Sequence, residues 1–354
     1  MSATCDRAAE SLTRDLGFSC HHVNPVASLN NPVELYSWTQ PLLEMLIIGG
    51  AIFALVHAIR RWRRDGDPAN LALWFGSLVY LAITEPPLYF PEWFGLDKIY
   101  GFIFAHNEFT VQFMYDRLPL YIVAFYPAMT ALAYEVVRGF GIFARRGAAV
   151  GAICVAFVSQ VFYEIFDHLG PQLKWWAWNA ENVQVNHPMF ASVPMNSMLL
   201  YASVSLGFLT YLIVRLAALP TAARAIVAGL LTPLGMVVAG IPSGLFDGNV
   251  PAQAWVLGIE LALVWIVGAW FVLRDARGAR QPLSRFAAIF PAAFLLVHAV
   301  MWLGALPEFL AARNGITPSG TPVGSGWYVL ACFVAASGVL ALLLRHGDRD
   351  REHA

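Results

Sequence analysis

Ionisable and amide side chains occur within stretches of this sequence that are otherwise apolar. The most compact group has the helical spacing i, i+4, i+7 and i+8 and consists of Gln160, Glu164, Asp167 and His168. Two carboxyl groups in a low-dielectric site are expected to titrate separately, which suits general acid–base chemistry. The sequence therefore predicts Glu164 and Asp167 as catalytic acids. The alternative is that both side chains reach the membrane interface and are solvated.

Further polar residues are scattered singly through the apolar stretches. An ionisable group at the centre of a membrane span costs roughly 2.5–3.5 kcal/mol, so such groups usually face a cavity, a pathway or the interior of a bundle. Glu85 is predicted as a third catalytic acid. For Glu44, Glu85 and Glu260 the alternative is a neutral, hydrogen-bonded contact between helices. Substrate binding is predicted for Gln160, Trp175, Trp176, Trp178, Asn196, Glu260 and His298.

Metal and cofactor chemistry has little support in the sequence. No His-x-x-x-His or His-Glu-x-x-His spacing is present, so no metal site is predicted. The only lysines, Lys98 and Lys174, lie outside the apolar stretches, which argues against a retinal Schiff base within the membrane. Because the sequence also lacks a phosphate-binding glycine loop and a nucleophile elbow, no cofactor is predicted.

The chain that must position these residues has 354 residues, of which 58% are hydrophobic and only 13% are charged. This charged fraction is about half that of soluble proteins, which excludes a soluble globular or disordered chain. A net charge of -1 and the absence of basic runs interleaved with aromatics give no support for nucleic-acid binding. The apolar runs are continuous rather than alternating, so the predicted fold class is an all-α polytopic integral membrane protein.

About nine transmembrane helices are predicted, because each span needs about 20 apolar residues. Of the 22 Lys and Arg residues, 16 fall on one side of these spans and 6 on the other, which places the N-terminus outside and the C-terminus in the cytoplasm. We therefore predict a multi-pass protein of the cell membrane, as in a bacterial inner membrane. The predicted spans lie at about 36–58, 71–90, 118–138, 147–167, 193–216, 221–243, 252–273, 284–305 and 325–345.

The domain organisation follows from these spans. An external tail over 1–35, a single transmembrane domain over 36–345 and a cytoplasmic tail over 346–354 are predicted. The first tail holds Cys5 and Cys20, whose pairing as a disulfide is left open. A parallel repeat over 70–138 and 147–216 is predicted from the similar order of acids, aromatic segments and prolines.

Two external segments, at about 91–117 and 168–192, are rich in aromatic residues. Because Trp and Tyr favour the membrane interface, one reading is that these segments are helices lying flat on the membrane. The other reading is a lid over an intramembrane cavity. The predicted acids lie close to these segments, so the second reading would place a site beneath the lid.

The region 85–200 resembles a known membrane family. Its strongest matches are Asp167-His168-Leu169-Gly170-Pro171, Trp176-Ala177-Trp178 and Val193-Pro194-Met195-Asn196. They resemble the second signature of the carotenoid-biosynthesis family that includes the bisanhydrobacterioruberin hydratases. Glu85 through Pro119 and Pro127 is only loosely similar to the first half, and Glu85-Pro86-Pro87 replaces its glycine-rich motif.

This resemblance implies an intramembrane enzyme that adds water to an isoprenoid double bond, with Asp167 and Glu85 as candidate acids. The favoured function is therefore a lyase or hydratase doing hydration or cyclisation on an isoprenoid or other membrane lipid. One alternative is a proton-coupled transporter or flippase for a lipid or small molecule, in which Pro86-Pro87 and Pro242 would mark broken helices. Another is a non-catalytic subunit of a membrane complex, with partners that the sequence does not identify.

Overall fold

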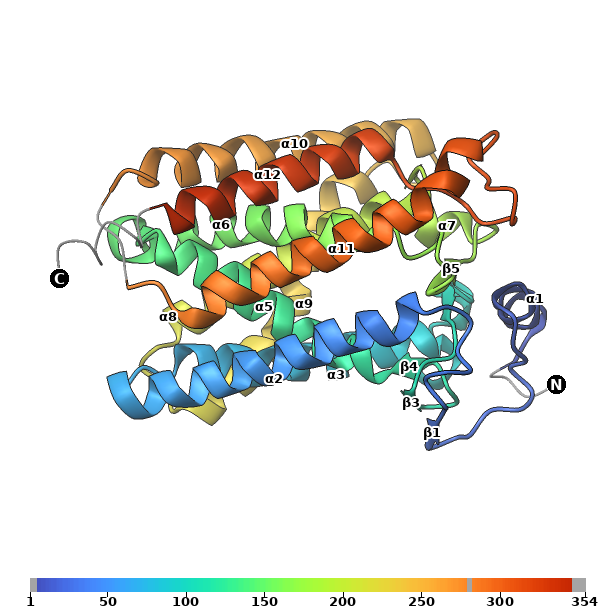
Figure 1. Cartoon of the computed structure of the whole chain (residues 1–354), viewed down its shortest axis with the longest axis horizontal. Coiled ribbons are helices and arrows are strands. Elements are labelled where there is room, and N and C mark those ends of the chain that lie inside the picture. Colours follow the sequence, from blue (N-terminus) through green and yellow to red (C-terminus); the bar gives the residue numbers. More distant parts are fainter. Residues whose placement is uncertain (1–4, 279–281, 346–354) are drawn as a thin grey trace.

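The computed structural model describes residues 5–278 and 282–345. Within these residues, nine helices are long and apolar enough to cross a membrane, which confirms the predicted helical membrane class. The chain is therefore a multi-pass membrane protein, and its long helices run along the long axis of the molecule (Figure 1). The spans are α2 (Thr39–Asp65), α3 (Ala69–Tyr89), α5 (Leu120–Gly139), α6 (Ile142–Asp167), η2 (Ser197–Ser205) continuing into α8 (Leu206–Arg215), α9 (Thr221–Gly244), α10 (Val250–Asp275), α11 (Arg285–Ala311) and α12 (Gly326–Leu344).

Local sequence signals determine several helix ends. The hydroxyl of Ser284 accepts a hydrogen bond from the backbone N–H of Ala287 and so caps α11. Gly66 ends α2 in the left-handed conformation, with φ 68°. The predicted end of this span, near residue 58, was too early, because the arginines that follow are good helix formers and continue the helix to Asp65.

The most buried spans, α5 and α6, form the centre of the bundle. Helices α2 and α3 pack on α5, whereas α8, α10 and α12 pack on α6 and α9 lies against α3. The close approach of α3 and α9 depends on glycine, because a Cβ atom at Gly229 would collide with the carbonyl oxygen of Gly76. Helices α9 and α10 are the least buried spans, so their outer faces are available to lipid.

Residues 90–119 and 168–196 cover one end of the bundle, and we call them the lid. They are not the long interfacial helices that one reading of the sequence predicted, because each folds into strands and short turns of helix. Strand β2 (Phe104–His106) pairs antiparallel with β5 (Trp176–Trp178) and so joins the two segments. The remaining lid elements are η1 (Pro91–Phe94), α4 (Asp97–Tyr100), β3 (Val111–Phe113), β4 (Leu118–Pro119), α7 (Val183–Asn186), β6 (Met189–Phe190) and β7 (Val193–Pro194).

The order of elements is similar in the two halves that the sequence predicts as a repeat. In the first half α3 is followed by β2, the hairpin β3–β4 and α5; in the second, α6 is followed by β5, the hairpin β6–β7 and η2–α8. Each hairpin ends at a proline close to the start of a spanning helix: Pro119 directly precedes α5, and Pro194 lies three residues before η2. This order is what a parallel repeat requires, and the repeat itself stays a prediction.

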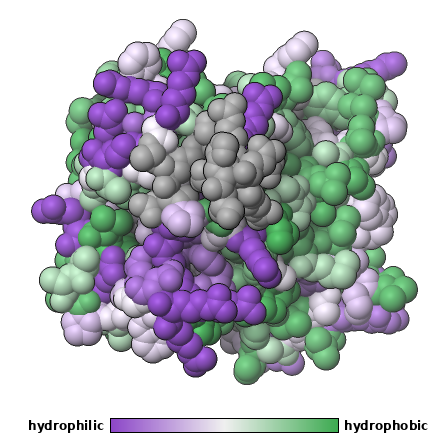
Figure 2. Space-filling view, turned by 60° about the vertical axis from the view of Figure 1, so that its left-hand side comes forward, coloured by the Kyte–Doolittle hydropathy of each residue, from purple (hydrophilic) through white to green (hydrophobic). Residues whose placement is uncertain are grey.

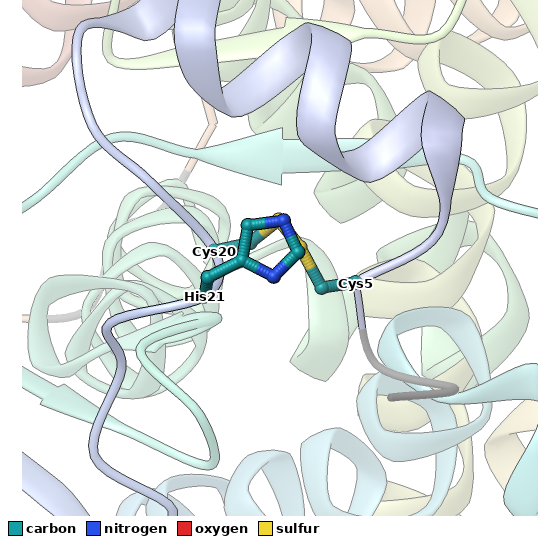
Figure 3. Close-up of side chains that lie close together, drawn as sticks. All are labelled: Cys5, Cys20 and His21. Carbon is teal, nitrogen blue, oxygen red and sulfur yellow. A yellow bond between two sulfur atoms is a disulfide. The ribbon is translucent and has the colours of Figure 1, made fainter. Parts of the chain in front are cut away.

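The segment before the first span is folded against the lid. Helix α1 (Arg7–Leu16) contacts β2 and β5, and strand β1 (Ala27–Leu29) pairs with β3. Cys5 and Cys20 form a disulfide, the pairing that the sequence left open, and the ring of His21 lies beside it (Figure 3). Because both sulfur atoms are bonded to each other, this cluster offers no thiolate to a metal ion.

The opposite end of the bundle carries most of the arginines, and we call it the arginine end. Figure 2 shows hydrophilic residues gathered over this end and hydrophobic residues over the flank on the right of the view. This separation agrees with the charge pattern from which the orientation was predicted, and the orientation stays a prediction. Arg280, Arg349, Arg351 and the predicted tail over 346–354 lie outside the described residues.

Candidate functional site

A cavity of about 550 Å³ lies beneath the lid. This volume is within the usual range for small-molecule sites, and the wall is mainly aromatic and aliphatic with a few polar groups. Its lining comes from the lid and from the adjacent ends of α3, α5, α6, η2, α9 and α10. The spanning helices contribute Glu85, Leu88, Tyr89, Ile122, Phe125, Tyr126, Tyr163, Phe166, Asp167, Ser197, Leu200, Tyr201, Gly240, Ser243, Gly244 and Gln253.

The cavity brings together two carboxyl groups from different helices. Glu85 on α3 is 6% exposed and Asp167 on α6 is 3% exposed. The hydroxyl of Tyr126 donates a hydrogen bond to Oε1 of Glu85, and that of Ser197 donates to Oδ2 of Asp167 over 3.5 Å. Among the described residues neither carboxyl group forms a salt bridge. Such groups are suited to transferring a proton to or from a bound molecule.

The predicted stripe on α6 divides between two environments. Asp167 borders the cavity, whereas Glu164 is absent from its lining and faces α12. The amide of Gln160 donates to Oε1 of Glu164 over 3.3 Å and to the hydroxyl of Tyr328 over 3.2 Å. Nε2 of His168 lies 3.4 Å from Oε2 of Glu164. Glu164 therefore belongs to a buried polar contact between α6 and α12.

The three predicted tryptophans also divide. Trp176 and Trp178 line the cavity, whereas Trp175 is fully buried and donates its Nε1 hydrogen to Oγ1 of Thr39 over 3.0 Å. Among the described residues, Nε1 of Trp176 and Nε1 of Trp178 have no hydrogen-bond partner. An unpaired buried donor is costly, so these two indole groups point to an occupant that carries an acceptor.

The remaining predicted residues are spread over the bundle. Asn196 lines the cavity and donates to the carbonyl oxygen of Val185 over 3.4 Å. His298 is fully buried and stacks on Phe294 at 4.0 Å, and Glu260 lies part-way along α10; neither borders the cavity. The structure thus gathers five of the predicted residues around the cavity: Glu85, Asp167, Trp176, Trp178 and Asn196.

Several cavity residues were not predicted from the sequence. His106 on β2 lines the wall with Nδ1 3.2 Å from the hydroxyl of Tyr121, and burial lowers its pKa to about 3, so it is neutral at pH 7. Tyr126 also escaped notice. One signal could have identified it, because Tyr126 lies seven residues after Pro119, as Tyr201 does after Pro194, and both tyrosines line the cavity.

Hydrogen bonds fix the lid over the cavity. The carboxylate of Glu44 on α2 accepts hydrogen bonds from the backbone N–H of Thr110 at 3.0 Å and from its hydroxyl at 2.5 Å. The amide of Asn186 bridges the two lid segments by donating to the carbonyl oxygens of Ile103 and Asn179. Glu44 therefore anchors the lid.

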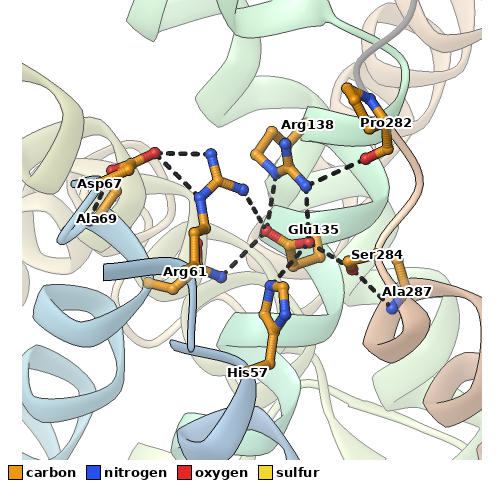
Figure 4. A network of polar contacts seen from close by, with 10 residues as sticks. His57, Arg61, Asp67, Ala69, Glu135, Arg138, Pro282, Ser284 and Ala287 are labelled. Carbon is orange, nitrogen blue, oxygen red and sulfur yellow. Dashed lines mark hydrogen bonds and ion pairs between the residues drawn. The ribbon is translucent and has the colours of Figure 1, made fainter. Parts of the chain in front are cut away.

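A second buried carboxylate lies at the arginine end and has a different character. Glu135 on α5 accepts hydrogen bonds from Arg138 at 2.8 Å, Arg61 at 3.2 Å and Ser284 at 2.7 Å, and lies 3.1 Å from His57 (Figure 4). Its partners come from α2, from α3 through Asn70, from the N-cap residue of α11 and from α5 itself. Because its charge is fully paired, we interpret this network as a connection between helices.

No protein-family model matches this chain, and neither a curated protein nor a solved structure is significantly similar to it.

Proposed function

We propose that this chain is an intramembrane enzyme that performs acid–base chemistry, hydration or cyclisation, on an isoprenoid or other lipid. The observation that carries the proposal is the cavity beneath the lid, where Glu85 and Asp167 border the same space from different helices within a mainly aromatic and aliphatic wall. The resemblance of 85–200 to the carotenoid-biosynthesis family supports the same chemistry, because its two candidate acids are the two buried carboxyl groups that border the cavity. We also propose the cell membrane as its location.

The chemistry that this arrangement suits is the protonation of a carbon–carbon double bond. One carboxylic acid donates its proton to one alkene carbon, and a cation develops on the neighbouring carbon. A water molecule then attacks this cation and loses a proton to the other carboxylate, so that the net change is addition of H and OH. In a cyclisation, a second double bond of the same substrate attacks in place of water and a proton is lost afterwards. Aromatic faces such as those of Phe125 and Phe166 stabilise the cation.

The positions of the two acids suggest a division of roles. Glu85 lies four residues before the end of α3, whereas Asp167 is the last residue of α6. At 1.5 Å per residue, Glu85 is therefore about 6 Å inside its helix end. We assign proton donation to the alkene to Glu85, which is buried, lies deeper in the bundle and accepts a hydrogen bond from Tyr126. Asp167, beside Ser197 and the lid, is assigned to the proton released by water.

The depth of the cavity favours an enzyme over the transporter alternative. Tyr126 lies about 9 Å along α5 from its first residue, and Gly240 lies about 6 Å from the last residue of α9. The midplane of a bilayer is about 15 Å below the edge of the hydrocarbon layer, and alternating-access sites lie near it. A site confined to one end of the helices suits a substrate that is bound and released on the same side.

The decisive experiment is an untargeted lipid and pigment profile of a strain that lacks the gene, complemented with wild type, Glu85→Gln or Asp167→Asn. These variants keep the shape of the side chain and remove its ionisation. The expected result is an unsaturated precursor that accumulates in the deletion strain and is cleared by wild type but by neither variant, at equal membrane levels. Unchanged lipid species, or lipids that differ only in their distribution across the envelope, would reject catalysis on a lipid and favour transport.

A further inference from the structure

We propose that the substrate enters the cavity sideways from the membrane, between the lid and the external ends of α9 and α10, and that it is a single-chain, largely apolar lipid. The inference rests on the proposed function for the use of the cavity, but the entry route follows from the cavity wall. The external end of a helix means the end next to the lid, and the term implies nothing about the side of the membrane.

The mouth of the cavity is located by those lining residues that are also exposed. They are Ile99 and Gln184 of the lid, Gly244 at the end of α9, and Asp247 in the loop between α9 and α10. Next to the last two, Leu245 is 78% exposed. Leu245 directly follows the last residue of α9, and an apolar residue so exposed at the end of a spanning helix faces lipid, so the mouth opens at the boundary between the lid and the bilayer.

Glycine residues of α9 form part of the cavity wall at this mouth. Gly240, Ser243 and Gly244 are the contribution of α9 to the lining. A Cβ atom on Gly244 would meet no atom within 4 Å, and one on Gly240 would meet only Leu200 Cδ1 at 3.9 Å. Because Gly240 and Gly244 lack a side chain, only the backbone of α9 separates the cavity from the lipid-facing side of this helix at these two positions.

The polar groups of the cavity indicate how the lipid lies. The unpaired indole N–H groups of Trp176 and Trp178 belong to the lid strand β5, and Trp176 is only 3% exposed. Phe125, Leu200 and Gly240 lie on the helices below the lid. A polar group of the lipid, or a bound water molecule, at the lid would accept hydrogen bonds from the two indole groups. The apolar chain of the lipid would then pass Gly240 and Gly244 into the bilayer.

One substitution tests this route. A leucine at position 244 would extend into the open space at the mouth, and Gly244 has an ordinary helical φ, so Gly244→Leu is tolerated by the backbone. Gly338→Leu in α12 is the matched control, because Gly338 is also exposed, helical and without atoms within 4 Å of an added Cβ, but it lies outside the lining. Gly240→Leu is a second variant, deeper in the same wall.

The readout is labelling by a photoreactive isoprenoid alcohol of about twenty carbons, with the full-length protein in nanodiscs and the labelled peptides identified by mass spectrometry. The expected result is labelling of cavity residues that falls about tenfold in Gly244→Leu and in Gly240→Leu and is unchanged in Gly338→Leu. Labelling of Gly244→Leu and Gly240→Leu at the wild-type level would overturn the route, and so would an equal fall in Gly338→Leu.

A further variant separates the entry route from the proposed chemistry. Glu85→Gln is expected to label like wild type, because it changes proton transfer and leaves the mouth open. If the lipid profile shows no precursor but labelling still depends on Gly244, the proposed chemistry is wrong and the lateral route stands. If the precursor accumulates but Gly244→Leu labels and converts it like wild type, the chemistry stands and the route is wrong.

Discussion

Glu164 and Asp167 lie three residues apart on α6, yet Asp167 borders the cavity and the carboxylate of Glu164 lies 3.4 Å from Nε2 of His168, outside the cavity lining. Both are almost fully buried, so burial alone does not identify the acid that meets the substrate. The face of α6 on which each acid lies determines which of them meets the substrate. Only Asp167 lies on the same face of α6 as Tyr163 and Phe166, which belong to the cavity wall.

The first prediction contrasts these two acids. Asp167→Asn is expected to reduce conversion of the precursor at least about a hundredfold, because removing a general base or acid commonly costs that much. Glu164→Gln is expected to retain conversion within about threefold while lowering thermal stability, since a buried contact is altered. Product formation per unit of protein in membranes checks both. Loss of conversion in Glu164→Gln with unchanged stability would return Glu164 to the catalytic set.

The second prediction concerns the hydrogen bond from Tyr126 to Glu85. Tyr126→Phe is expected to lower conversion about tenfold, because a hydrogen bond to a reacting carboxyl group contributes on the order of 1.5 kcal/mol. Tyr134→Phe is the matched control, since Tyr134 is a buried tyrosine on the same helix that does not border the cavity. The pH dependence of conversion is expected to shift in the first variant and to stay unchanged in the second. Equal effects of the two would remove Tyr126 from the proposed mechanism.

The third prediction tests the connecting role of Glu135. Glu135→Gln is expected to destabilise the protein by about 3 kcal/mol, because it leaves Arg61 and Arg138 without their buried counter-charge. Asp67→Asn is expected to cost about 1 kcal/mol or less, since the side chain of Asp67 is 34% exposed and its pair with Arg61 is partly screened. Unfolding in mixed micelles measures both. A Glu135→Gln variant of wild-type stability would contradict this role.

The fourth prediction concerns the disulfide between Cys5 and Cys20, which encloses a loop with a sequence separation of 15. A loop of this size corresponds to a stabilisation of about 3 kcal/mol for the part of the chain it closes. Reductant is therefore expected to increase proteolysis of the segment before α2 in wild type. The double variant Cys5→Ser/Cys20→Ser is expected to be cleaved at the increased rate without reductant. Adding reductant should not change its rate of cleavage further. A reductant effect of equal size in both proteins would show that the effect does not come from the Cys5–Cys20 disulfide.

The fifth prediction follows from His106, whose pKa burial lowers to about 3. In the unfolded chain a histidine has a pKa near 6.5, so between about pH 6.5 and pH 3 the unfolded state binds a proton that the folded state excludes. This residue therefore makes stability fall as the pH decreases, by up to about 1.4 kcal/mol per pH unit. His106→Gln is expected to lose less stability than wild type between pH 7 and pH 5. An identical slope in unfolding experiments would show that His106 takes up a proton in the folded protein.

The class of the protein can be predicted from the amino-acid sequence without any structure. Continuous apolar runs of about 20 residues are sufficient to predict spanning helices, because the backbone in lipid must satisfy its own hydrogen bonds. The sequence also singled out Glu85, Asp167, Trp176, Trp178 and Asn196, because polar and aromatic residues stand out against an apolar background. The predicted helix ends were less accurate. In α2 the arginines after residue 58 extend the helix, because arginine is a good helix former.

Which of these residues share a cavity depends on how the helices and the lid pack. Residues 160, 164, 167 and 168 follow one helical stripe, but the cavity lies on one side of that stripe and α12 on the other, which no spacing along a single helix reveals. His106 and Tyr126 join the site through the pairing of β2 with β5 and the packing of α5 against α3. Gly240 and Gly244 carry no chemical group at all, and their place in the wall depends on helix packing, a long-range property that local sequence does not encode.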